Sequence, residues 1–168
     1  MISVLYVDDE PDLLDIARIF LERTGKYTID TCTSVPDAKR MLASTPYDAI
    51  VSDYQMPGED GIDFLKFVRG HVGPTPFILF TGRGREEVVI QALENGADFY
   101  IQKGGDPRAQ FAELRNKIEK AVNERRAVLA QKETEQRLTD IINFLPDATL
   151  AIDADGTVIA WNDAMVRM

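Results

Sequence analysis

Five polar residues stand where short apolar runs of the sequence end. In chain order they are Asp8, Asp9, Asp53, Thr81 and Lys103. Three carboxylates gathered at one place repel each other and stay ionised only if a cation lies among them. Oxygen ligands that leave coordination positions open suit Mg²⁺, which keeps several waters and also binds phosphate oxygens. These residue types therefore predict a magnesium site that can receive an anionic phosphoryl donor.

The two remaining residues of this set extend the same chemistry. The hydroxyl of Thr81 can donate a hydrogen bond to a phosphoryl oxygen, and the ammonium of Lys103 can neutralise another. An aspartate beside these groups can act as a nucleophile and form an aspartyl phosphate. Since positioning and charge neutralisation account for most of the catalysis in phosphoryl transfer, no further catalytic group is required.

An alternation of strands and helices must position these residues. The expected strands are 2–7, 27–33, 48–52, 76–80 and 98–102, and the expected helices begin at Pro11, Ser34, Asp60, Arg85 and about Pro107. Such alternation implies right-handed crossovers and a parallel sheet, and near-continuous apolar strands such as 77–80 agree with it. We expect an α/β fold with a flavodoxin-like, doubly wound, five-stranded parallel sheet. Ligands bind outside the carboxyl ends of such strands, where the five polar residues fall.

A long helical segment follows this region. No glycine or proline interrupts residues 108–145, and apolar residues recur there at helical spacing. This length predicts a coiled coil or a connecting helix. Arg125, Lys132 and Glu135 fall on positions that resemble a coiled-coil core, so the seam is imperfect and a solvent-exposed single helix stays an alternative.

Composition limits the possible partners and locations. The chain has 168 residues and a net charge of -9, which argues against a nucleic-acid-binding surface in these residues. No apolar run approaches the roughly 18 residues of a membrane span, and the N-terminus lacks the pattern of a signal peptide. The single cysteine, Cys32, fits a small core side chain in a reducing compartment. We therefore expect a cytoplasmic protein.

Four motifs together resemble the response-regulator receiver family of two-component systems. They are D-D-E at 8–10, S-D-Y-Q-M-P-G at 52–58, T-G at 81–82 and the lysine at 103. The resemblance covers roughly residues 1–122. It implies phosphorelay signalling, in which Asp53 accepts a phosphoryl group from a phosphohistidine of a sensor histidine kinase or a phosphotransfer protein.

The resemblance also implies a role for each site residue. Asp9 and Asp53 would ligate Mg²⁺ through carboxylates, Gln55 through its backbone carbonyl, and Asp8 largely through water. Thr81 and Tyr100 would form a switch pair that alters the surface of the fourth helix, fifth strand and fifth helix. A homodimer through that face or through the linker helix is the expected assembly.

The sequence departs from the family pattern after Lys103, where Gly104 and Gly105 replace the usual proline. A cis bond before glycine would cost ~3 kcal/mol, so we expect a trans bond. Gly82 has no side chain that could shield an acyl phosphate, which predicts fast self-dephosphorylation.

The C-terminal residues resemble the start of a PAS sensor domain. The motifs are L-P-D-A at 145–148, I-D-A-D-G-T-V at 152–158 and W-N at 161–162, with a hairpin signal between them. The predicted organisation is a receiver domain at 1–122, a helical linker at 123–137, and the truncated α+β beginning of a PAS domain at 138–168.

Other functions compete with this interpretation. The main alternative is the N-terminal receiver part of a larger hybrid histidine kinase whose catalytic domains lie beyond Met168, since residues 1–168 hold no ATP-binding glycine boxes and only His71 in a loop-like context. A haloacid-dehalogenase-like phosphatase would need an aspartate where Gln55 stands. A flavodoxin would need a phosphate loop in place of the acidic residues 8–10. A receiver that has lost phosphorylation and only dimerises stays possible because of Gly104.

Overall fold

A five-stranded parallel sheet forms the N-terminal part of the protein. The computed structural model describes residues 1–82 and 86–166. The strands are β1 Ile2–Val7, β2 Tyr27–Cys32, β3 Ala49–Ser52, β4 Phe77–Thr81 and β5 Phe99–Gln102, in the spatial order β2-β1-β3-β4-β5. This order and the parallel pairing confirm the predicted flavodoxin-like sheet.

Helices connect the strands close to where the sequence predicts them. They are α1 Pro11–Glu22, α2 Val35–Ser44, α3 Gly61–Phe67, α4 Glu86–Glu94 and α5 Pro107–Phe144. The expected start of the fourth helix at Arg85 lies outside the described residues. Pro11 begins α1 without needing a backbone donor, and the Ser34 hydroxyl accepts a hydrogen bond from the Asp37 amide at the start of α2.

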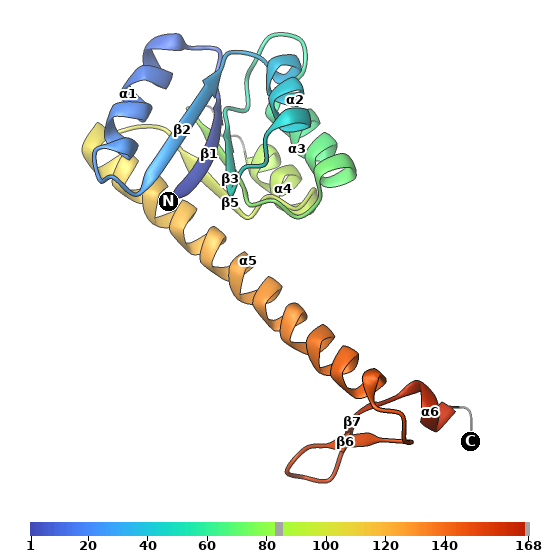
Figure 1. Cartoon of the computed structure of the whole chain (residues 1–168). Coiled ribbons are helices and arrows are strands. Elements are labelled where there is room, and N and C mark those ends of the chain that lie inside the picture. The colour runs from blue at the N-terminus through green and yellow to red at the C-terminus, as the bar shows by residue number, and fades with distance from the viewer. Residues whose placement is uncertain (83–85, 167–168) are drawn as a thin grey trace. The chain divides into compact units, whose positions relative to one another are not determined.

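The sheet separates two apolar layers. On one face, α1 and α5 pack against the strands through residues such as Leu14, Leu21, Phe111 and Leu114. On the other face, α2, α3 and α4 cover the strands (Figure 1), with Ala38, Phe64, Leu65, Val88 and Ala92 in the buried cluster. Because both faces are covered, the strands carry apolar side chains in both directions and their polar residues are confined to the strand ends.

The third helix differs from its predicted form. The helix expected from Asp60 is divided: α3 ends at Phe67 and continues as a π-helix, η1 Val68–Val72. Its wider turn is closed by the Gly73 amide, which donates to the Val68 carbonyl over 2.8 Å. Gly73 has φ 102°, a conformation that glycine adopts without steric cost.

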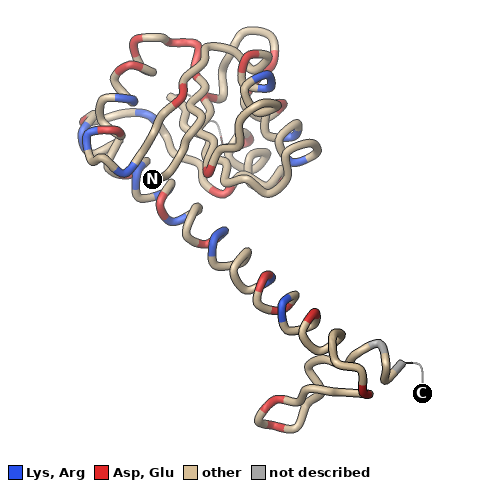
Figure 2. The backbone as a smooth tube through the Cα atoms, viewed as in Figure 1, with Lys and Arg blue, Asp and Glu red and all other residues tan. Residues whose placement is uncertain are grey.

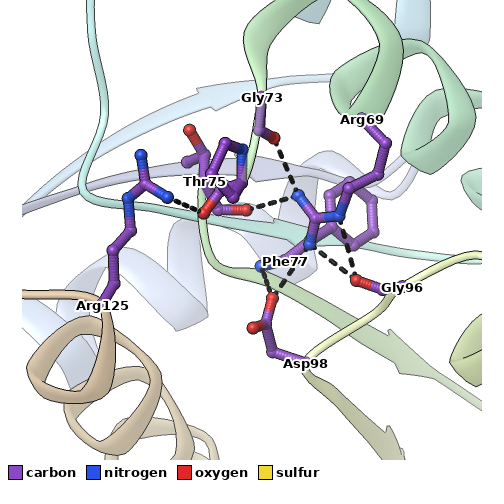
Figure 3. A network of polar contacts seen from close by, with 8 residues as sticks. Arg69, Gly73, Thr75, Phe77, Gly96, Asp98 and Arg125 are labelled. Atoms are coloured by element: carbon purple, nitrogen blue, oxygen red, sulfur yellow. Dashed lines mark hydrogen bonds and ion pairs between the residues drawn. The ribbon is translucent and has the colours of Figure 1, made fainter. Parts of the chain in front are cut away.

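Arg69, on that π-helix, holds the amino-terminal ends of β4 and β5 together (Figure 3). Its guanidinium donates to the carbonyls of Gly73, Thr75 and Gly96, and it forms an ion pair with Asp98 at 3.0 Å. The same Asp98 oxygen accepts the Phe77 amide over 2.7 Å. Nearby, Arg125 of α5 donates to the carbonyl of Pro74. This network holds the amino-terminal ends of the two strands in place, at the opposite end of the sheet from Asp8, Asp53 and Lys103.

The chain divides into two compact units, Met1–Arg125 and Arg126–Met168, and α5 has residues in both. The predicted long helix is present as α5, which has 38 residues. Along α5, basic and acidic residues are interspersed rather than segregated by sign (Figure 2). Its residues Val128, Leu129 and Ile141 are exposed. Within the described residues, no helix is both long and apolar enough to cross a membrane.

The second unit contains an antiparallel hairpin of β6 Leu150–Ile152 and β7 Val158–Trp161, followed by α6 Asp163–Val166. A carboxylate oxygen of Asp153 accepts the amides of Asp155 and Thr157 and shapes the turn. Asn162 is buried, accepts the Thr149 amide, and donates to the carbonyls of Leu145 and Asp147. Asn162 therefore serves as a structural connector between the hairpin and the segment before it.

Candidate functional site

The carboxyl ends of the central strands bring Asp8 and Asp53 side by side. In the β1–β3 ladder Val7 lies opposite Ser52, and each strand's next residue is an aspartate. The Asp53 amide donates to the Val7 carbonyl over 2.8 Å, which extends the pairing by one position. The predicted meeting of polar residues at this edge is therefore observed for these two carboxylates.

Lys103 lies between the two carboxylates. Its ammonium nitrogen is 2.6 Å from a carboxylate oxygen of Asp8 and 3.1 Å from one of Asp53. The Lys103 side chain is 14% exposed and the Asp8 side chain is fully buried. The ammonium also lies 5.7 Å from the centre of the Phe80 ring. The single ammonium of Lys103 thus offsets the charge of one of these two carboxylates.

Burial sets the protonation behaviour of Asp8. Loss of solvent raises the pKa of the Asp8 carboxyl, and the hydrogen bond and charge of Lys103 oppose that effect. The amide of Glu10 also donates to Asp8 over 3.0 Å and favours the ionised form. Burial therefore opposes the charge of Asp8, while Lys103 and the Glu10 amide support it.

The loop after β3 is held tightly around Asp53. The Gln55 amide donates to an Asp53 carboxylate oxygen over 3.0 Å, and the Gly61 amide donates to the Tyr54 carbonyl over 2.9 Å. A Cβ atom on Gly61 would lie 2.2 Å from the Asp53 carbonyl oxygen. Since only glycine fits this close approach, Gly61 fixes the position of Asp53, and a single sequence does not reveal that role.

Asp9 and Gln55 lie at the open side of the same edge. Both line a hollow of about 390 Å³ together with Tyr54, Met56, Pro57 and Asp60. Asp9 is exposed, and across residues 1–82 and 86–166 no group of three or more histidine, cysteine, aspartate or glutamate side chains is arranged to hold a metal ion. In this arrangement Lys103 stands between two of the acids, and the third acid faces solvent.

The donor set nevertheless fits a hard divalent cation. Asp8 and Asp53 present carboxylate oxygens at one edge, the backbone of Gln55 is adjacent, and Asp9 borders the same hollow. Oxygen ligands of this kind, with space left for water, are those that Mg²⁺ takes. The buried hydroxyl of Tyr6, which has no hydrogen-bond partner among the described residues, lies within the electrostatic reach of Asp8 and Asp53.

Thr81 and Tyr100 come from neighbouring strands. Thr81 is the last residue of β4 and is buried, and its carbonyl accepts the Lys103 amide over 2.7 Å. Tyr100 is half-buried in β5, and its hydroxyl has no hydrogen-bond partner within the described part of the chain. Loss of solvent, followed by the charge of Asp53, raises the pKa of Tyr100. Both residues therefore adjoin the acidic edge.

The segment after Lys103 follows the expected trans geometry, because the described residues contain no cis peptide bond. Gly104 and Gly105 have φ 151° and 84°, values that other residues rarely adopt. Glycine at these positions lets the chain turn from β5 into α5 while Lys103 points back to Asp8.

The fold is a doubly wound parallel sheet, and two acids and a lysine meet at the carboxyl ends of its strands. This combination is typical of α/β domains that accept a phosphoryl group on an aspartate. The family described as the response regulator receiver domain matches residues 4–119. The chain belongs to this family, and it therefore contains a receiver domain of two-component signalling.

Relatives of known sequence and structure agree with this assignment. The response regulator SaeR of Staphylococcus aureus (strain USA300) is 36% identical over 116 residues, which cover 69% of this chain and 50% of SaeR. The chain thus matches about half the length of this curated relative.

Two solved structures show the same fold. The signal receiver domain of a signal transduction histidine kinase from Syntrophus aciditrophicus is 28% identical, with a TM-score of 0.65 over 74% of this chain and 92% of that one. The response regulator TrrA from Thermotoga maritima, solved in complex with Mg²⁺ and BeF, is 28% identical, with a TM-score of 0.63 over 72% of this chain and 99% of that one.

Proposed function

We propose that Asp53 accepts a phosphoryl group from the phosphohistidine of a sensor histidine kinase or phosphotransfer protein, in a reaction that requires Mg²⁺. The observation that carries the proposal is the position of Lys103, 2.6 Å from Asp8 and 3.1 Å from Asp53. An ammonium at this point can neutralise an oxygen of a phosphoryl group bound to Asp53 without moving far. The TrrA structure with Mg²⁺ and BeF supports the cation requirement by similarity.

Each residue of the site has a task in this chemistry, and Asp53 has two. An Asp53 carboxylate oxygen attacks phosphorus and forms an acyl phosphate, while the phosphorus–nitrogen bond of the donor breaks and its electron pair stays on the imidazole. Asp8, Asp9, Asp53 and the Gln55 carbonyl would hold the cation, which offsets the negative charge of the donor. Lys103 and the Thr81 hydroxyl would bind phosphoryl oxygens and stabilise the charge that develops on them.

The signal would leave the site through Thr81 and Tyr100. Movement of Thr81 toward the phosphoryl group opens space into which Tyr100 can turn, and its hydroxyl, unpartnered among the described residues, leaves it without a competing hydrogen bond. This change alters the surface of α4, β5 and α5. Ile90 and Leu93 of α4 are exposed there and would take part in a homodimer.

The remaining residues would transmit this change. We assign residues 1–122 to the receiver, 123–137 to a helical linker that can also dimerise, and 138–168 to the beginning of a PAS domain. The β6–β7 hairpin and the connecting role of Asn162 support a folded element there. The presence or absence of kinase catalytic domains in the full-length protein would distinguish a response regulator from the alternative, a hybrid histidine kinase. The kinase-borne receiver of Syntrophus aciditrophicus gives that alternative a structural precedent.

Incubation with acetyl phosphate tests the proposal. With Mg²⁺, intact mass should show one added phosphoryl group, and peptide mapping should place it on Asp53. The matched variants are Asp53→Asn, which should stay unmodified, and Asp63→Asn, which changes an exposed carboxylate of α3 and should be modified normally. A phosphoryl group that maps to another residue, or that is added equally in EDTA, would refute the proposal.

The lifetime of the modified form is a second property of this site. The position of Gly82 leaves room for a methyl group, since an added Cβ would lie 3.8 Å from the Cβ of Lys103. Such a group would cover part of the path for water, so Gly82→Ala should lengthen the acyl-phosphate half-life several-fold in a decay assay. An unchanged half-life would show that Gly82 does not set the rate.

A further inference from the structure

Tyr6 is a buried tyrosine whose hydroxyl has no hydrogen-bond partner among the described residues. Its exposed fraction is 0%, and it lies on β1, an interior strand of the sheet. A hydroxyl taken out of water without a partner lowers stability, and phenylalanine would fill the same space without that cost. A hydrogen-bond acceptor that reached this hydroxyl in another state of the protein would remove that cost.

The side chain of Tyr6 lies in the same buried cluster as Phe80, on the face of the sheet that carries α1 and α5. Tyr6 precedes Asp8 by two residues, so the alternation of a strand directs both side chains to the same face of the sheet. The Tyr6 ring packs edge-on against Phe80, with centroids 6.4 Å apart, and Phe80 in turn lies beneath the Lys103 ammonium. Tyr6, Phe80 and Lys103 thus form a stack that ends at the Asp8 carboxylate.

The electrostatic surroundings of the hydroxyl agree with this placement. Burial raises the pKa of Tyr6 well above its ordinary value, and the charges of Asp8, Asp53 and Glu10 raise it further. The hydroxyl is thus an O–H donor on which the charge of Asp8 acts more strongly than that of Asp53 or Glu10. In the present arrangement Asp8 is already satisfied by Lys103 and the Glu10 amide.

Binding of a divalent cation would change that balance. A cation attracted to Asp8 and Asp53 competes with the Lys103 ammonium for the same oxygens. Once Lys103 withdraws from Asp8, a carboxylate oxygen of that buried residue loses its donor.

We propose that the Tyr6 hydroxyl then becomes the donor to Asp8, directly or through one water, and so acts as a positioning residue for the cation site. The inference rests on the proposed magnesium dependence of the receiver. Groups that hydrogen-bond to metal ligands typically change metal affinity by 10- to 100-fold when they are removed.

Calorimetric titration of the full chain with MgCl₂ tests the inference, using wild type, Tyr6→Phe and Tyr27→Phe. The Tyr27 hydroxyl donates to Glu119 over 2.9 Å, so its removal breaks an existing hydrogen bond between the same sheet and α5. Tyr6→Phe should weaken Mg²⁺ binding by about tenfold, while its melting temperature in EDTA stays equal to or rises above that of wild type. Tyr27→Phe should show the reverse, with unchanged Mg²⁺ affinity and a lower melting temperature.

Two results would overturn the inference and one would overturn its foundation. Equal Mg²⁺ affinity of wild type and Tyr6→Phe would show that the hydroxyl is only tolerated in the core. A lower melting temperature of Tyr6→Phe in EDTA would show that the hydroxyl is already bonded without the cation. Absence of Mg²⁺ binding by folded wild type would instead refute the proposed function itself.

Discussion

The side chains of Lys103 and Asp8 form a buried ion pair, in which 2.6 Å separates the ammonium nitrogen from a carboxylate oxygen. These residues are far apart in sequence and meet because β1 and β5 end at the same edge of the sheet. A cation bound to the acids must share Asp8 with this ammonium. In the receiver site, the Lys103 ammonium and a bound divalent cation therefore compete for the Asp8 carboxylate.

Removal of the Lys103 charge should separate cation binding from phosphoryl transfer. Lys103→Met should bind Mg²⁺ roughly threefold to tenfold more tightly, because the competing ammonium is gone, which corresponds to ~1 kcal/mol. The rate of phosphorylation should fall by about 100-fold, because the phosphoryl oxygen loses its neutralising group. Calorimetry and phosphorylation kinetics measure the two effects. Lys120→Met, which changes an exposed lysine, is the control. Weaker Mg²⁺ binding by Lys103→Met would show that Lys103 supports the cation site.

The raised pKa of Asp8 predicts a pH dependence of stability. An acid whose pKa is higher in the folded state than its ordinary value of 3.8 favours folding below that value, and this contribution is lost as the pH rises through the folded-state pKa. Without Mg²⁺, the stability of wild type relative to Asp8→Asn should therefore decrease as the pH increases from about 4 to 7. Urea denaturation across this range measures the difference. Asp9→Asn, at an exposed position, is the control, and a relative stability that rises with pH would contradict the prediction.

Replacement of Gly61 should disturb Asp53 through backbone contact. The added Cβ of Gly61→Ala would lie 2.2 Å from the Asp53 carbonyl oxygen and 2.8 Å from a Leu79 methyl group. Relief of this overlap should cost about 1–3 kcal/mol of stability and displace the Asp53 loop, so phosphorylation should slow as well. Gly70→Ala, which meets no atom within 4 Å, should leave both properties nearly unchanged. Normal activity and stability of Gly61→Ala would show that the loop adapts without loss.

The Arg69 network should depend on the planar shape of the guanidinium as well as on its positive charge. Lysine keeps the charge but cannot reach Gly73, Thr75, Gly96 and Asp98 at once, so Arg69→Lys should lose roughly 2–3 kcal/mol of unfolding free energy. The midpoint of urea denaturation measures the loss. Arg18→Lys, in an exposed pair with Glu22, is the matched control and should change the midpoint little. Equal midpoints for the two variants would mean that charge alone suffices at position 69.

The sequence predicted the sheet and the polar strand ends because both arise from local rules. Runs such as 77–80 are apolar on both faces, and the residue that follows an apolar strand at the carboxyl edge is polar where a site is built. The helix starts at Pro11 and Ser34 likewise follow from local capping preferences.

Features that depend on contacts between distant segments were not predicted. The bridge of Lys103 between Asp8 and Asp53, the π-helix after Phe67 and the unpartnered hydroxyl of Tyr6 each require the folded arrangement. In the sequence, Tyr6 stands in an apolar run and resembles an ordinary core aromatic residue. Only the folded structure shows that its buried hydroxyl has no hydrogen-bond partner among the described residues.

The initial rate of phosphoryl incorporation into Asp53, measured with acetyl phosphate across a Mg²⁺ titration, shows whether the nucleophile works through a cation bound by the acidic residues. The rate should be near zero in EDTA, and it should rise to half its maximum at the Mg²⁺ concentration equal to the dissociation constant from calorimetry. A rate in EDTA equal to that in saturating Mg²⁺ would contradict this role of the cation.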